Sequence, residues 1–153
     1  MAYWLFKTEP DAFSLDDLQQ APQQTTVWEG VRNYQARNFI RDEIKLGDQV
    51  MIYHSSCKHV GVVGIATVTK AAYPDLTQFD LSSDYYDAKA THDNPRWYVV
   101  DVTYQSRLNK LVSLKSIKAN PAITELVLKK AGRLSVMPVT ANDWQQIMAM
   151  AAD

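Results

Sequence analysis

Three segments in the middle of the chain are rich in β-branched residues and most constrain the fold. They span residues 49–54, 60–69 and 96–107. The first of them alternates apolar and polar side chains, which is typical of a strand with one buried face. A fourth apolar run, at residues 3–8, also has strand character. The sequence therefore predicts that these four segments pair in one sheet.

Helix signals lie before and between these strands. Ser14, with Asp17 three residues later, forms a capping-box pattern and predicts a short helix over residues 14–20. Apolar residues at helical spacing predict a second helix over residues 31–42. The polar, proline-containing stretch at 21–27 between them is predicted to be a loop.

The C-terminal third adds further elements. Asn as a cap and Pro at the first helical position predict a helix over residues 120–130. A short strand is expected over residues 134–139, followed by a helix capped by Thr140. Ser113 is expected to begin a short helical turn. Strands mixed with helices at the start, middle and end indicate an α+β fold.

Glycines and a long irregular stretch mark special positions in the strand region. Gly61 and Gly64 lie inside a strand pattern, where glycine indicates a bulge, a bend or a close backbone approach. Residues 73–95 are irregular and rich in Asp, Ser, Tyr and Pro. A loop of that length in a compact domain is usually functional or carries a short helix.

The composition places limits on the class of protein. A chain of 153 residues has the size of one domain, so we expect a single domain over residues 1–153. Neither a membrane-length apolar run nor a signal-peptide pattern is present, and the single cysteine, Cys57, fits a reducing compartment. An intracellular location is expected, cytoplasmic or, in a eukaryote, nuclear. The net charge of −1 argues against broad neutralisation of duplex phosphates, but it allows a reader that holds one extruded nucleotide.

The segment from Trp28 to Arg37 has the most unusual composition. It reads Trp-Glu-Gly-Val-Arg-Asn-Tyr-Gln-Ala-Arg. Aromatic rings offer stacking faces, Asn and Gln can contact base edges, and Arg can bind phosphate. Gly30 allows the backbone to turn or to approach a ligand closely. The segment therefore predicts a pocket for a flat polar ring beside a phosphate. The alternative is a loop-to-helix junction in which Trp28 and Tyr34 belong to the core.

Motifs along nearly the whole chain resemble the EVE domain family, which belongs to the PUA-like group with the YTH and ASCH domains. The similarity is carried by Tyr3–Pro10, Trp28–Tyr34, Tyr53–Ser55, Val62–Ala66, Ala72–Asp75, Tyr85–Asp87, Pro95–Trp97 and Arg133–Val136. Two departures are visible. Glu29 stands where the family commonly has Asp, which keeps the charge. Residues 56–59 replace a turn that often contains proline, which puts the shape of this loop in doubt.

The resemblance implies a PUA-like curled sheet, or pseudo-barrel, that binds a chemically modified base of DNA or RNA, such as methylated or hydroxymethylated cytosine. The base pocket is expected to contain Trp28, Gly30, Val31, Asn33, Tyr34, His54 and Ser55. Phosphate or rim contacts are expected from Lys7, Arg32, Arg37 and Arg96, and a lid from Tyr85 and Tyr86.

Several of these residues have structural alternatives. Arg37 and Arg41 lie four residues apart on the predicted helix and could form a solvated face with carboxylate partners such as Asp42. Lys7 and Glu9 point to one side of a strand and could pair with each other. The two tyrosines of the long loop could pin that loop to the core.

No metal or cofactor is expected. The pattern His54-x2-Cys57-x-His59 offers three ligands without a fourth, and zinc sites normally use two spaced pairs. An enzyme acting on a nucleotide or RNA is the main alternative function, with Lys7 and Glu9 as the only candidate acid–base pair. A protein-interaction module, whose pocket holds a peptide, is the third.

Overall fold

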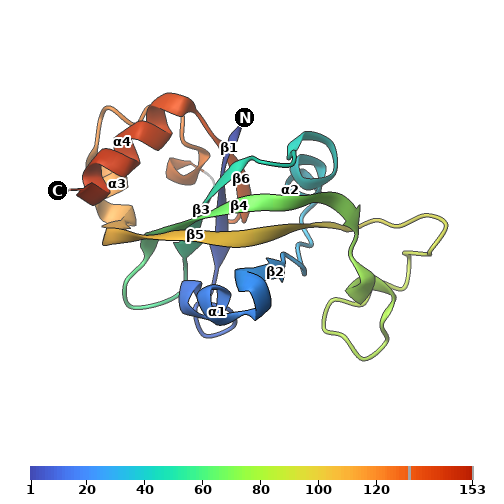
Figure 1. Ribbon diagram of the computed structural model, residues 1–153. Helices are drawn as coiled ribbons and strands as arrows, with labels where there is room; N and C mark the ends of the chain where they lie inside the picture. The colour runs from blue at the N-terminus through green and yellow to red at the C-terminus, as the bar shows by residue number, and fades with distance from the viewer. Residues whose placement is uncertain (131, 153) are drawn as a thin grey trace.

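The computed structural model describes residues 1–130 and 132–152, and its centre is a six-stranded curled sheet (Figure 1). The strands are ordered β2-β5-β4-β3-β1-β6. All four predicted strands lie in this sheet, which confirms the α+β prediction. Their bounds are Tyr3–Thr8 (β1), Thr25–Val27 (β2), Gln49–His54 (β3), Gly61–Pro74 (β4), Tyr98–Ser113 (β5) and Val136–Val139 (β6).

The sheet is mixed, and β1 is the strand at which parallel and antiparallel pairing meet. β1 runs parallel to β3, with Tyr3 opposite Gln49, and antiparallel to β6, with Tyr3 opposite Val139. The other neighbouring strands pair antiparallel. The strand near the start of the chain is therefore hydrogen-bonded to a strand near its end.

Glycines permit the close pairing of β4 with its neighbours, as the sequence predicts. A side chain at Gly61 would place its Cβ 2.9 Å from Ser113 Cα, and at Gly64 only 2.5 Å from Leu15 Cδ2. The register between β4 and β5 shifts between Val62 and Gly64. These positions bend β4 and let α1 pack on the sheet.

Short helices cover the sheet and its edges. They comprise α1 (Leu15–Gln20), the 3-10 helix η1 (Pro22–Gln24), α2 (Tyr34–Asn38) continuing into the π-helical turn η2 (Phe39–Glu43), the 3-10 helix η3 (Leu76–Phe79), α3 (Leu114–Ala119), the 3-10 helix η4 (Val127–Lys129) and α4 (Ala141–Ala152). The predicted caps are confirmed at Ser14, whose side chain and that of Asp17 form a capping box, and at Ser113. The Thr140 hydroxyl accepts a hydrogen bond from the Asp143 N–H at the start of α4.

Three secondary-structure predictions are wrong. Residues 25–27, expected in a loop, form β2 because they pair with β5. The helix expected from residue 31 begins at Tyr34, so Arg32 lies before it rather than in its first turn. Residues 120–130 form turns and η4 instead of a helix, because the Asp143 carboxylate accepts the N–H groups of Thr124 and Glu125.

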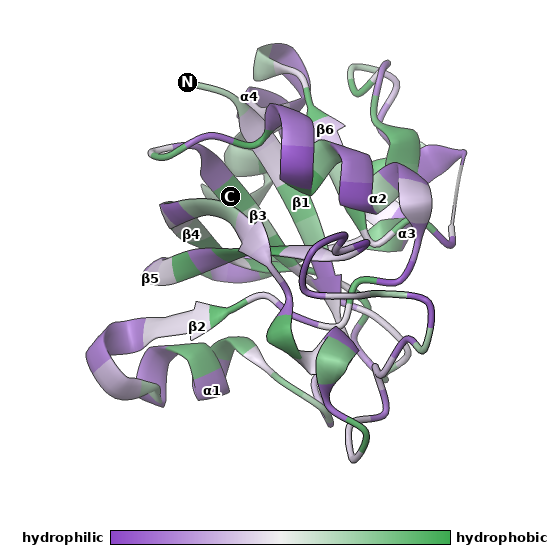
Figure 2. Cartoon of the chain, turned by 90° about the vertical axis from the view of Figure 1, so that its right-hand side faces the viewer, coloured by the Kyte–Doolittle hydropathy of each residue, from purple (hydrophilic) through white to green (hydrophobic). Residues whose placement is uncertain are grey.

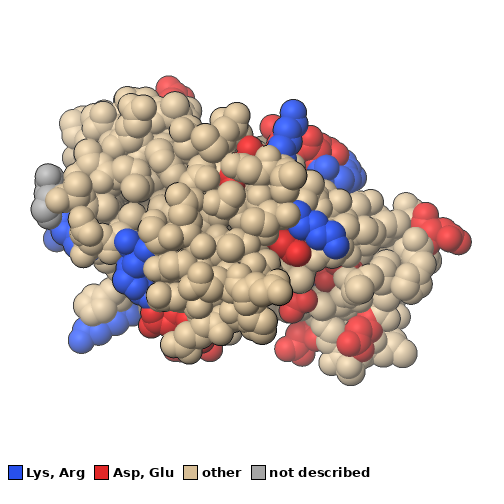
Figure 3. All heavy atoms as spheres, in the orientation of Figure 1, with Lys and Arg blue, Asp and Glu red and all other residues tan. Residues whose placement is uncertain are grey.

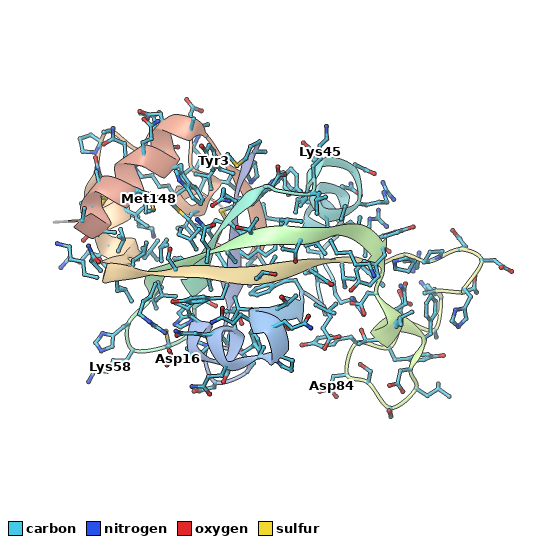
Figure 4. All side chains as sticks on the ribbon, viewed as in Figure 1. Tyr3, Asp16, Lys45, Lys58, Asp84 and Met148 are labelled. Carbon is cyan, nitrogen blue, oxygen red and sulfur yellow. The ribbon has the colours of Figure 1, made fainter. Side chains whose placement is uncertain are left out.

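Apolar side chains from both faces of the sheet form the core. Figure 2 shows hydrophobic residues along the inner strands and hydrophilic ones on the outer loops and helices. In Figure 4, Tyr3 on β1 lies beside α4, which carries Met148, and the Tyr3 ring stacks on Trp144 at 4.6 Å between centroids. Among the described residues, no helix is long and apolar enough to cross a membrane.

Candidate functional site

An open cavity of about 400 Å³ lies where the end of β1, the end of β2 and the segment after β2 meet. This volume is within the range of roughly 300–1,000 Å³ that small-molecule sites occupy. Its lining comes from Lys7, Thr8, Glu9, Ala12, Phe13, Thr26, Val27, Trp28, Glu29, Gly30, Val31, Arg32, Tyr85 and Ser135. Aromatic, charged and hydroxyl side chains therefore share one concave surface.

Trp28 belongs both to this cavity and to the core. Its side chain is 8% exposed, and its ring lies 5.3 Å from Phe6 and 6.4 Å from Phe13 between centroids. Its backbone N–H donates to the carbonyl of Val100 at 2.9 Å, which fixes the segment to β5. Trp28 therefore lines the cavity and also packs in the core.

A buried carboxylate holds the segment after Trp28 in place. Asp75, 1% exposed, accepts hydrogen bonds from the Gly30 N–H at 2.9 Å and from Arg32 Nη1 at 3.0 Å. It also accepts from the backbone N–H and the hydroxyl of Thr77. Burial alone would raise the pKa of Asp75, but the hydrogen bonds from Thr77, Gly30 and Arg32 outweigh burial and hold this pKa below its ordinary value.

Arg32 connects this carboxylate to the loop after β4. Its Nε and Nη2 atoms donate to the carbonyl oxygen of Tyr85 at 3.1 and 2.8 Å, and Nη2 also donates to Thr77 Oγ1. The guanidinium lies 5.4 Å from the centre of the Tyr85 ring. Arg32 therefore fixes Tyr85 at the cavity.

The Tyr85 ring rests on the backbone of Gly30. A Cβ atom at Gly30 would lie 2.6 Å from this ring, so only glycine permits the contact. Figure 4 shows the preceding residue, Asp84, on the loop that hangs below the sheet. Tyr85 lines the cavity and is 43% exposed, which places one of the two predicted lid residues at its mouth.

Gly30→Ala is expected to displace Tyr85, and Gly47→Ala is a matched control. Both glycines have positive φ, +82° and +90°, but a Cβ at Gly47 meets nothing within 4 Å. The positive φ costs each variant about 1–2 kcal/mol of unfolding free energy. Gly30→Ala should lose more and should speed amide hydrogen exchange around Tyr85, as chemical denaturation and exchange measurements can check. Equal losses with unchanged exchange in both variants would contradict this role for Gly30.

Two basic and two acidic side chains line the cavity, and one of the basic ones, Arg32, is paired with the buried Asp75 carboxylate. Lys7 Nζ donates to the carbonyl of Gly132 at 2.7 Å, and burial lowers the pKa of Lys7. Desolvation, together with the nearby Asp75 carboxylate, raises the pKa of Glu29, which Arg32 opposes. Lys7 and Glu9 both face the cavity, as their spacing predicts, but Lys7 bonds the chain near β6, and no ion pair joins it to Glu9 within the described residues.

Four residues predicted for the base pocket lie outside the cavity, which corrects that part of the prediction. The Asn33 side chain caps α2 by accepting from the Ala36 N–H, and the Tyr34 ring stacks on Trp97. His54 Nε2 accepts from the Leu15 N–H at 3.1 Å, and burial lowers the pKa of His54, so the neutral ring serves as a structural acceptor. The Ser55 N–H donates to the carbonyl of Thr8.

Tyr34 instead belongs to a partly exposed cluster of aromatic rings and arginines, which we term the Tyr34–Trp97 cluster; Tyr34 is 49% exposed and Trp97 is buried. The two rings lie 4.9 Å apart between centroids, and the guanidinium of Arg37 lies 4.8 Å from the centre of the Tyr34 ring. Arg96 lies 6.0 Å from the same ring and forms an ion pair with Asp87 at 3.6 Å. Arg37 also donates to the carbonyl of Arg96, so two predicted rim arginines meet here rather than at the cavity.

Two further residues considered in the sequence analysis, Tyr86 and Arg41, do not line the cavity. Tyr86 is 40% exposed and does not line the cavity, so the two-residue lid is reduced to Tyr85. Arg41 pairs with Asp42 at 2.8 Å, which agrees with the solvated-face alternative for that residue. No group of three or more potential metal ligands occurs in the parts of the chain that the structure covers.

The sequence prediction missed several lining residues. Thr8 and Glu29 lie inside the quoted motifs, and an acidic residue inside an aromatic motif was an available signal. Ser135 also lies inside a quoted motif, and the pairing of β1 with β6 brings the segment before β6 to the cavity. Phe13 lies outside the quoted motifs and carried no local signal. Asp75 is a quoted motif residue whose buried role depends on Arg32, 43 positions away in the sequence.

Comparison with known proteins gives consistent matches over the whole chain. The family model described as EVE domain matches residues 2–150. The chain is 41% identical to thymocyte nuclear protein 1 of Rattus norvegicus over 165 residues, which covers 97% of this chain and 73% of the relative. It is 36% identical to the human THYN1 protein, solved in complex with DNA containing 5-methylcytosine, with a TM-score of 0.96 and coverage of 100% and 99%. An ASCH protein of Zymomonas mobilis, 8% identical with a TM-score of 0.55 and coverage of 98% and 99%, shares the fold.

Proposed function

The chain belongs to the EVE domain family, and from this premise we propose that it binds nucleic acid by taking one chemically modified base into the cavity beside Trp28. The human relative solved with 5-methylcytosine DNA makes this modified base the first candidate. The activity proposed is recognition without catalysis, and no cofactor is required. A single domain and an intracellular location, cytoplasmic or nuclear, complete the proposal.

The observation that carries the proposal is the combination of stacking surfaces and polar groups in one open cavity. Trp28 and Phe13 supply apolar walls, and Tyr85 lies at the mouth. Stacking a base on an aromatic ring is worth roughly 1–3 kcal/mol, which offsets the few kcal/mol needed to unstack the base from a strand. A methyl group buried against such a wall adds about 0.8 kcal/mol.

The Tyr34–Trp97 cluster is proposed to contact the strand outside the cavity. Arg32 links the two regions, since its guanidinium lies 5.3 Å from the Trp97 ring while the residue also lines the cavity. Arg37 and Arg96 then lie where phosphates of the flanking nucleotides would pass. In Figure 3 basic and acidic residues lie near one another on the left and upper parts of the face shown, and the right-hand lobe shows only acidic ones. The described residues of this face therefore form no broad basic surface to coat a duplex, which favours a few local phosphate contacts.

A panel of labelled oligonucleotides tests the proposal. Single- and double-stranded DNA and RNA, with cytosine or 5-methylcytosine at one position, are titrated with the protein and followed by fluorescence anisotropy. We expect the methylated oligonucleotide to bind about threefold or more tightly than the unmodified one, since one buried methyl group is worth about 0.8 kcal/mol. Equal binding of all modified and unmodified oligonucleotides, or no binding at all, would contradict the proposed function.

A further inference from the structure

Glu29 lines the cavity and stands in the sequence between two residues that shape its aromatic surfaces. It follows Trp28, which forms the inner wall, and precedes Gly30, which supports the Tyr85 ring. Its own N–H donates to the carbonyl of Val27, while its neighbours are fixed to Val100 and Asp75. The backbone at Glu29 is therefore held at the cavity wall from both sides.

The Glu29 carboxylate has no protein partner among the residues that the structure covers. Arg32 is the nearest motif cation, but its guanidinium already donates to Asp75, Thr77 and the carbonyl of Tyr85. Glu29 is an exposed residue of the cavity lining, and partial desolvation there raises its pKa above the ordinary value. An ionised carboxylate only accepts hydrogen bonds, so Glu29 presents an unused acceptor to whatever enters the cavity.

The charge of the lining also selects against phosphate. Arg32 is neutralised by Asp75, which leaves Lys7 against the two carboxylates of Glu9 and Glu29. A phosphate group in this cavity would meet an excess of negative charge. A neutral base that carries a hydrogen-bond donor would not, and its amino group would satisfy the carboxylate.

We propose that Glu29 determines which base the cavity accepts, by accepting a hydrogen bond from the exocyclic amino group of the base. Cytosine and adenine present such a donor, whereas thymine and uracil present a carbonyl oxygen at the equivalent position. Among pyrimidines the cavity therefore selects cytosine and its 5-substituted forms. This inference rests on the proposed function, because it assigns a specificity to the same cavity.

A carboxylate at this position should also make the cavity reject thymine. A thymine carbonyl facing a partly desolvated carboxylate leaves two acceptors opposed and without donors. Sites built to bind a particular polar group discriminate strongly against an analogue that lacks it, because the protein group then stays unpaired. Thymine also carries a 5-methyl group, so it matches 5-methylcytosine in apolar contact and differs at the hydrogen-bonding edge.

The test compares 5-methylcytosine with thymine at one position of a DNA duplex, opposite an abasic site so that no base pair opposes extrusion. Binding is measured by fluorescence anisotropy for the wild-type protein and for Glu29→Gln, Glu29→Asp and Glu43→Gln. The wild type should prefer 5-methylcytosine by roughly tenfold or more. Glu29→Gln, whose amide can donate as well as accept, should reduce the preference to about threefold or less, chiefly through tighter binding of thymine.

The other two variants distinguish the effect of the Glu29 carboxylate from the effect of a change in net charge. Glu29→Asp should keep most of the preference. Glu43→Gln removes a carboxylate from an exposed residue of η2 that does not line the cavity, so it should leave the preference unchanged. A preference retained in Glu29→Gln, or lost in Glu43→Gln instead, overturns this inference while the proposed function stands. Failure of the wild-type protein to bind either duplex would overturn both. Melting temperatures near that of the wild type, expected for an exposed side chain, show that each variant is folded.

Discussion

Trp28→Ala is expected to abolish binding of a modified-base oligonucleotide and to lower the free energy of unfolding by about 3–5 kcal/mol, as large-to-small changes of buried aromatic residues do. Both effects have one cause, since the ring is 8% exposed, packs against Phe6 and Phe13, and still forms a wall of the cavity. The measurements are chemical denaturation and oligonucleotide binding on the same preparation.

Trp28→Phe separates the two roles. Phenylalanine keeps an aromatic face against the cavity but leaves part of the indole volume empty, so this variant should lose less stability and retain measurable binding. Binding is best measured at a temperature at which denaturation shows all variants to be folded. If Trp28→Ala binds as tightly as the wild type under those conditions, base stacking on Trp28 is excluded and the residue serves the core alone.

Arg32→Ala is expected to be the most damaging change among the three predicted rim arginines, Arg32, Arg37 and Arg96. It leaves the Asp75 carboxylate buried without its cation, and it releases the carbonyl of Tyr85. Breaking a buried ion pair by removing one partner costs about 3–5 kcal/mol, and the partial exposure of Arg32 places the expected loss of unfolding free energy at the lower end. Binding should weaken as well, because the residue that positions Tyr85 is lost.

The double variant Arg32→Ala with Asp75→Asn is the control for stability. Removing the charge at position 75 eliminates the unpaired buried carboxylate, so stability should recover in part while Tyr85 stays untethered. Arg32→Lys keeps the positive charge but cannot reproduce the forked hydrogen bonds. If Arg32→Ala is as stable as the wild type yet binds about 1–3 kcal/mol more weakly, Arg32 instead contacts phosphate or base directly.

The sequence predicted those features that depend on neighbouring residues. Ser14 and Ser113 begin helices because their side chains reach N–H groups three residues ahead, which is visible in the sequence. The glycine-marked irregularity of β4 has the same local origin. The helix expected at residues 120–130 does not form, and Asp143, some twenty residues later, accepts hydrogen bonds from the N–H groups of Thr124 and Glu125. This competition between the Asp143 carboxylate and helical hydrogen bonds is visible only in the folded chain.

The sequence predicted only part of the candidate site, because neighbouring residues determine the position of only some of its side chains. Trp28, Gly30 and Arg32 reach the cavity because the backbone after β2 lines it. Asn33 was interpreted as a reader of base edges, yet asparagine is also a preferred helix cap, and that local role is the one it has. Tyr34 does not line the cavity, because its ring stacks on Trp97. Trp97 is distant in sequence, so no local pattern could predict this contact.

The pairing of β1 with both β3 and β6 has a consequence for the order of events during synthesis. The cavity needs Lys7 and Glu9 at the end of β1, but also Ser135 and the Gly132 carbonyl just before β6. A ribosome-bound chain that lacks β6 would hold β1 with one unpaired edge, which is open to pairing with other chains. Such long-range pairing folds slowly. The ability to bind should therefore arise late, after residues near both ends of the sequence have met.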